Sequence, residues 1–307
     1  MDGLFVAFLN SLTALTICLG IGFVCRKTEI INDNHTAGMT NLLVRIAMPA
    51  TVFMSLMRPF SRELLLESLA TVAITGVIYV LSGYLGLFIA KIMKATPGER
   101  QAWQFGVAFG NVGFMGIPIV TAVFGQEAII YVAMALTSFN LLAFTLGARM
   151  FDDAPKEVNI KNLMIKNPAI PAVFIGFGFF LTGLRLPSAV EGGIELIGTI
   201  TTPMSMVLLG VILAKQSLKD AFTDAKLLPA IGAKLIIVPI VTLLVLRWFV
   251  PNQLMLSVIV TLMAMPPAAL AAIFAQQFDA DAFVAAKFVV VGTVLCVVTV
   301  PLISLLL

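Results

Sequence analysis

The segment with the clearest chemical potential is Asn111–Pro118, NVGFMGIP, which lies inside a long apolar run. Its proline removes a backbone donor and clashes with the preceding helical turn, and Gly110, Gly113 and Gly116 lower helix propensity, so we expect a helix broken near its middle. The second half of this broken helix would begin with unpaired N–H groups, which favour an anion. Asn111 adds two donors without the desolvation cost of a charge. A carboxylate is the expected ligand.

A second break is expected at Pro266 and Pro267, in the run VTLMAMPPAALAAIFAQQ. Two interrupted membrane helices in corresponding positions of two halves indicate a transport site at the bilayer midplane. Small residues around both breaks, including the GxxxG spacing of Gly106 and Gly110, allow helices to approach closely, so we expect two broken helices that cross. The alternative is a pair of proline-kinked helices without function, because Pro and Gly are common in membrane helices.

The composition sets the solvent in which these breaks lie. Hydrophobic residues make up 60% of the 307 residues, charged residues only 11%, and the mean hydropathy is +1.06, whereas about a quarter of a soluble domain is charged. The chain is therefore expected to be an all-α integral membrane protein. Most Lys and Arg fall in short connections, which leaves no basic patch for nucleic acid. Three cysteines without ligand-like spacing indicate neither a disulfide framework nor a metal site, and no cofactor is expected.

Ten apolar runs are candidates for spans, each of which needs roughly 20 residues to cross about 30 Å of hydrocarbon. The odd-numbered connections carry 12 Lys and Arg residues in or beside them and the even-numbered ones 4, which places the odd connections in the cytoplasm and both termini outside. The N-terminal run lacks a basic region and a cleavage site, and we expect it to be retained. The runs lie near residues 4–25, 37–57, 64–90, 101–122, 127–149, 168–184, 192–213, 227–249, 253–275 and 282–305.

The ten spans divide into two five-helix halves, residues 1–150 and 168–307, joined by a cytoplasmic connection at residues 151–167. A five-span unit enters its second copy from the opposite side of the membrane, so a duplication here predicts an inverted repeat. An offset of 154 residues aligns Gly22 with Gly176, Pro49 with Pro203, Pro97 with Pro251, and Glu127 with Asp281.

These features resemble the auxin efflux carrier family over nearly the whole chain. The most specific element is the Asn-x-x-x-x-Gly-Ile-Pro pattern from Asn111 to Pro118. Further matches are NLLVRIAMPATVF with Pro49, NLLAFTLG with Asn140, and KNPAIPAVFIG with Asn167 and Pro168.

The resemblance implies a bacterial member related to the plant PIN carriers, a homodimer in the cytoplasmic (inner) membrane. It implies a scaffold of spans 1, 2, 6 and 7 and a moving transport domain of spans 3, 4, 5, 8, 9 and 10. This architecture is similar to that of sodium/proton antiporters and bile-acid symporters. Substrate is expected where spans 4 and 9 cross, with Asn111 contacting its carboxylate. Ala169 departs from the plant pattern, which has a second binding asparagine there, and the third span lacks the plant acid and lysine pair, so auxin itself is not the expected substrate.

Charged residues inside the spans give further candidates. Arg45 lies about 13 Å deep at 1.5 Å per residue and is the best charged candidate for anion contact. Lys234 lies at a similar depth, in a span that could pack outward, and is assigned no role. Lys287 either snorkels to the surface or supports the crossing by neutralising helix C-termini. The expected substrate-binding residues are Asn111, Gly113, Pro118, Pro266, Pro267, Asn140 and Arg45, with Lys287 as charge support.

The expected function is secondary transport of small organic anions by alternating access, with an elevator-like movement of one domain. No nucleophile, zinc or nucleotide motif is present, the only histidine is His35, and the pair Asp152 and Asp153 lies in a connection, so an enzyme is not expected. The alternatives are a cation/proton exchanger of similar fold, which would ordinarily need a midplane aspartate, and a membrane sensor that binds an anion without moving it. Uniport, proton symport and sodium symport all stay open.

Overall fold

The computed structural model describes residues 2–151, 168–214, 225–278 and 280–307, and those residues form helices without a strand. Within these described ranges, six helical segments are long and apolar enough to cross a membrane, and three shorter apolar helices accompany them. The expected connection at residues 151–167, with Asp152 and Asp153, lies almost wholly outside the described residues. The architecture is that of a multi-pass membrane protein.

The helices of the first half follow the expected apolar runs. The first run forms one helix, and the second and fourth are each divided into shorter pieces. In order they are α1 (Asp2–Lys27), α2 (Asp33–Leu42), α3 (Met48–Leu56), α4 (Arg62–Ile92), α5 (Pro97–Ala108), α6 (Ile117–Phe124) and α7 (Ile129–Leu142).

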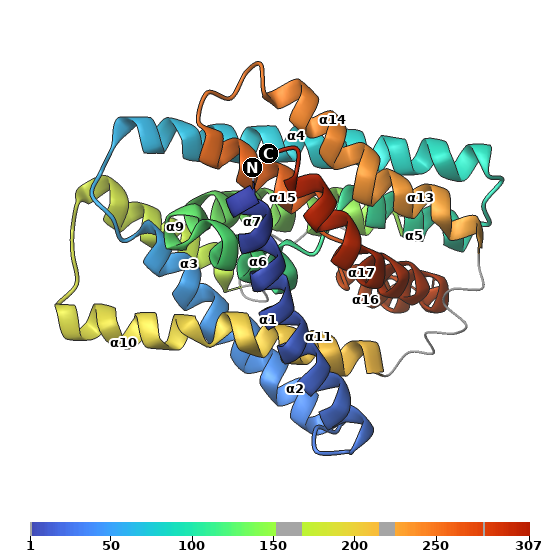
Figure 1. The fold of residues 1–307 in the computed structure, drawn as a ribbon, viewed down its shortest axis with the longest axis horizontal. Coiled ribbons are helices and arrows are strands. Elements are labelled where there is room, and N and C mark those ends of the chain that lie inside the picture. The colour runs from blue at the N-terminus through green and yellow to red at the C-terminus, as the bar shows by residue number, and fades with distance from the viewer. Residues whose placement is uncertain (1, 152–167, 215–224, 279) are drawn as a thin grey trace.

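The helices of the second half follow the same pattern. In Figure 1, α4 runs along one side of the bundle, and α10 and α11 follow one another along the other side. The elements are α9 (Ala169–Thr182), α10 (Ser188–Thr199), α11 (Thr201–Ala214), α13 (Leu228–Gly232), α14 (Val238–Leu246), α15 (Gln253–Met263), α16 (Leu270–Gln277) and α17 (Ala282–Ser304).

Three prolines inside the spans follow closely after π-helical turns. A proline in an α-helix lacks a donor and clashes with the carbonyl four residues before it, and a π turn inserts a residue that moves this carbonyl away. The interruption of this span lies at residues 109–111, near its middle as expected, and Pro118 itself lies inside the helical segment that follows. The π segments that precede a proline are Leu43–Ala47 before Pro49, Val112–Gly116 before Pro118, and Ala233–Ile237 before Pro239.

Glycines set the closest helix contacts outside the interrupted spans. A β-carbon at Gly22 of α1 would overlap the carbonyl oxygen of Val207 in α11, and one at Gly210 of α11 would overlap that of Leu19. A β-carbon at Gly176 of α9 would lie 3.4 Å from the carbonyl oxygen of Phe53 in α3. The pair α1 with α11 is thus packed backbone to backbone, and α9 packs closely on α3 at Gly176, where a β-carbon would lie 2.8 Å from Cδ1 of Leu56.

Candidate functional site

The interruption between α5 and α6 lies against the interruption between α15 and α16. The N–H of Asn111 donates to the carbonyl oxygen of Pro266 at 2.7 Å, and the N–H of Ala268 donates to that of Phe109 at 3.0 Å. Gly110 and Pro267 form an antiparallel bridge between these two hydrogen bonds. Backbone groups released from two helices are therefore paired with each other at a buried place, as a membrane interior requires.

Asn111 also caps the helical segment that follows the first interruption. Its side-chain oxygen accepts a hydrogen bond from the N–H of Phe114 at 3.2 Å, and its carbonyl oxygen accepts from the N–H groups of Met115 and Gly116. The side chain is 4% exposed. Because the cap uses the amide oxygen, an anion at this place would meet the amide NH2 group.

Small residues let the neighbouring helices reach the two interruptions. A β-carbon at Gly292 of α17 would lie 2.5 Å from Cδ of Pro267, and one at Gly116 would lie 2.7 Å from Cδ2 of Leu262. A β-carbon at Gly106 would overlap the ring of Phe288. These three positions cannot carry a larger side chain without a shift of their neighbours.

Lys234 is the charged side chain that the structure brings to the interruptions. It lies in the π segment before α14, is fully buried, and its Nζ has no hydrogen-bond partner in the described part of the chain. A β-carbon at Gly110 would lie 3.1 Å from this Nζ, 3.2 Å from the carbonyl oxygen of Met265 and 3.3 Å from that of Leu262. The ammonium group is therefore close to the negative C-terminal end of α15.

The family was decided by comparison with known proteins. The profile of the family described as "Membrane transport protein" matches residues 7–304. The chain belongs to this family. The predicted membership of the auxin efflux carrier family is thereby confirmed, and the protein is a membrane transporter and not an enzyme.

Three relatives of this membrane transporter cover most of its length. It is 24% identical over 310 residues to an "Uncharacterized transporter" of Methanothermobacter thermautotrophicus, with 99% of this chain and 100% of the relative covered. It is 22% identical over 305 residues to the "Uncharacterized transporter YfdV" of Escherichia coli, with 96% of each covered. It is 24% identical over 273 residues to a protein of Rhizobium meliloti named "Putative malonate transporter", with 85% of this chain and 84% of the relative covered.

The structure brings four of the transporter's expected site residues to the interruptions: Asn111, Gly113, Pro266 and Pro267. Gly113 also reaches the helix α3, because a β-carbon there would lie 2.7 Å from Cε of Met48. The interruptions are thus within reach of the second span as well.

The remaining expected residues lie at other places in the transporter. Pro118 is buried in the first turn of α6, and Asn140 is buried near the end of α7. Arg45 is exposed in a π segment. The ammonium group of Lys287 lies 4.6 Å from the ring centroid of Phe283 on the same helix.

Sequence reasoning gave Lys234 no role, although its depth in the membrane was apparent. Which face of a helix a midplane residue occupies depends on packing, which the apolar eighth span does not reveal. The sequence signal that could have pointed to it is Pro239, five residues further on. In the structure Lys234 lies in the π segment before this proline, and such segments often lie at functional sites.

Proposed function

We propose that this membrane transporter is a secondary carrier of small organic anions, and that the carboxylate of its substrate binds at the paired interruptions. The observation that carries the proposal is the buried ammonium group of Lys234, which has no hydrogen-bond partner among the described residues and lies beside Gly110, the residue before Asn111. A buried cation without a partner is costly in a membrane and favours a negatively charged ligand.

The charge balance of the interior supports an anion over a cation. The charged side chains that are buried among the described residues are Glu99 and Lys234. Glu99 completes the capping box of Thr96 at the start of α5, near a membrane surface, and accepts the N–H of Thr96 at 2.7 Å. The helical segment Val112–Phe124 begins directly after Asn111 and adds the positive end of its dipole.

A relative's name supports the same substrate class. The Rhizobium meliloti relative is named as a malonate transporter, and malonate is a short dicarboxylate. We propose the broader class of small carboxylates for this chain.

We also propose the inverted repeat and the scaffold of spans 1, 2, 6 and 7. Under the offset of 154 residues, Gly22 corresponds to Gly176 and Phe53 to Val207. Gly22 packs against the carbonyl of Val207 while Gly176 packs against that of Phe53, so aligned positions make exchanged contacts. Such exchange is what a two-fold relation between repeats would produce.

A hydrogen-bonded cluster supports the proposed transport domain of spans 3, 4, 5, 8, 9 and 10. The carboxylate of Glu67 in α4 accepts from the hydroxyl of Tyr131 in α7 at 2.6 Å and from the amide of Asn252, at the start of α15, at 2.7 Å. Spans 3, 5 and 9 are thereby joined through one half-buried carboxylate. These spans would move as one body in an elevator-like step.

The test is a thermal-unfolding screen of purified protein against short mono- and dicarboxylates, indole acids and sodium, followed by flux into liposomes. A ligand at one hundred times its dissociation constant stabilises the folded state by about 2.7 kcal/mol. We expect stabilisation and flux with a short carboxylate. Stabilisation by sodium or protons alone would favour the cation exchanger, and binding without flux would favour the sensor.

A further inference from the structure

We propose that a groove at one end of α4 binds the phosphate-bearing headgroup of an anionic phospholipid through Arg100 and Arg149. The groove has a volume of about 370 Å³ and lies between the C-terminal half of α4, the start of α5 and the end of the span Gln126–Gly147. It is separate from the paired interruptions, and the inference does not rest on the proposed substrate.

The polar lining of the groove suits a phosphate. Two guanidinium groups come from different helices, and Gln104 and Tyr84 add further polar atoms. No acidic residue lies among the described residues that line it. The ion pairs found in the described parts of the chain, Arg26 with Asp33 and Arg185 with Glu191, leave these two arginines out. Two arginines can hold a phosphate with charge-assisted hydrogen bonds.

The depth of the groove matches a lipid headgroup. Arg100 lies in the first turn of α5, and Arg149 lies two residues beyond the end of the span Gln126–Gly147, so both belong near a membrane surface. Tyr84 is 65% exposed and lies about 12 Å before the end of α4 at 1.5 Å per residue, where an amphipathic ring meets the interface. Basic pockets between membrane helices are typical sites for anionic headgroups.

The apolar lining of the groove suits the rest of the lipid. Leu87 and Met150 line it beside the arginines. The adjoining ridge of α4 exposes large apolar side chains, among them Leu81, Phe88 and Ile92. Acyl chains of a lipid can lie along this ridge towards the membrane interior and cover its apolar side chains. A soluble phosphate would leave these side chains uncovered.

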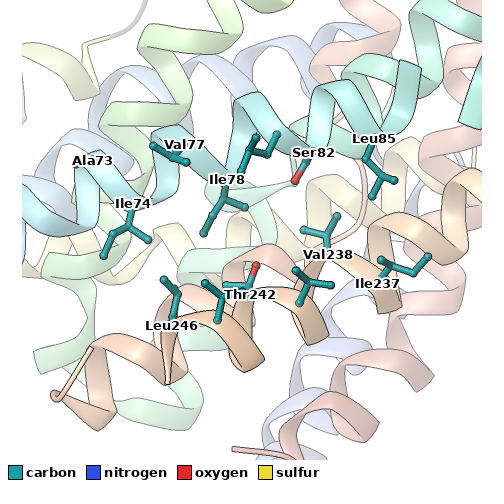
Figure 2. Close-up of a pocket in the computed structure, with 13 residues that line it drawn as sticks. Ala73, Ile74, Val77, Ile78, Ser82, Leu85, Ile237, Val238, Thr242 and Leu246 are labelled. Carbon is teal, nitrogen blue, oxygen red and sulfur yellow. The ribbon is translucent and has the colours of Figure 1, made fainter. Parts of the chain in front are cut away.

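A second groove, on the other side of the same ridge, lacks the charged lining of the first. It has a volume of about 410 Å³ and lies between α4 and α14, where Figure 2 shows Ile74, Ile78 and Leu246 among apolar side chains that converge from both helices. Ser82 and Thr242 are its polar lining residues, and no charged residue lines it among the described residues. The second groove offers no charged group to a headgroup among the described residues, whereas the first offers two guanidinium groups.

The experiment compares phosphatidylglycerol with phosphatidylcholine, by native mass spectrometry and thermal unfolding of purified full-length protein in detergent. The variant is R100Q/R149Q. Its matched control is R62Q/R247Q, which removes the same charge from two exposed arginines at the opposite end of the helices. Inorganic phosphate at equal concentration is the third arm.

We expect phosphatidylglycerol to bind and stabilise the wild type and the control, and to bind R100Q/R149Q at least about tenfold more weakly. Phosphatidylcholine should bind all three proteins alike. Equal binding of phosphatidylglycerol by R100Q/R149Q and the control would overturn the proposal. Stabilisation of the wild type by inorganic phosphate to the same extent as by the lipid would also overturn it, in favour of a site for a soluble anion.

Discussion

The N–H of Asn111 and the carbonyl oxygen of Pro266 form a 2.7 Å hydrogen bond that joins the interrupted helices of the two halves of the chain. Pro266 and Pro267 suit this place, because they lack N–H groups that would otherwise need acceptors in a buried environment. The asparagine therefore has two separate tasks: its backbone joins the two interruptions and its side chain caps the segment that follows.

The two tasks of Asn111 can be separated by substitution. Asn111→Ser keeps an oxygen for the cap and removes the amide NH2, so we expect a folded protein whose carboxylate affinity falls about tenfold to a hundredfold. Asn111→Ala removes the cap as well and should cost about 0.5–2 kcal/mol of stability in addition. Isothermal titration and thermal unfolding measure the two effects, and wild-type affinity in the serine variant would refute the site assignment.

Lys234 and Lys287 give opposite expectations. Lys234→Met should remove most carboxylate affinity, while thermal stability is retained or raised because an unpartnered buried charge disappears. Lys287→Met is the matched control, since its ammonium group lies on Phe283, and we expect affinity within about twofold of wild type. Carboxylate binding measured on both variants decides which lysine the site needs. If carboxylate affinity falls in Lys287→Met alone, the charge-support role returns to Lys287.

The contact between α1 and α11 predicts that two glycines, two residues apart in α1, differ in how much a substitution by alanine changes stability. Gly22→Ala should destabilise the protein by about 1–3 kcal/mol, because its β-carbon would overlap the carbonyl of Val207. Gly20 has no neighbour within 4 Å, so Gly20→Ala should be neutral or stabilising by up to about 1 kcal/mol. Unfolding temperatures of the two variants test this, and equal values would contradict the packing.

Tyr131→Phe tests the cluster that joins α4, α7 and α15. Loss of the hydroxyl that donates to Glu67 should cost about 1.5–3 kcal/mol, the range for hydrogen bonds to charged groups. Tyr84→Phe is the control for stability, because Tyr84 is exposed. If the two variants unfold at the same temperature, the cluster does not stabilise the proposed transport domain.

The sequence predicted the interrupted spans and the apolar runs, but some details depend on tertiary packing. Glycine and proline content located both breaks to within a few residues, yet the position of the first break relative to Pro118 depended on a π turn that no local pattern showed. The buried orientation of Lys234 depends on the helices that surround it. The cluster of Glu67, Tyr131 and Asn252 needs three elements that are far apart in the chain.

The two hydrogen bonds between the interruptions use main-chain atoms only. Replacing one side chain by another removes neither a donor nor an acceptor, unless proline is placed at Asn111 or Ala268. Apart from the close-packed glycines and the capping Asn111, side chains around the interruptions can therefore change while these main-chain hydrogen bonds stay in place. A carrier built in this way can acquire a new cargo through single substitutions, without having to rebuild the frame that holds it.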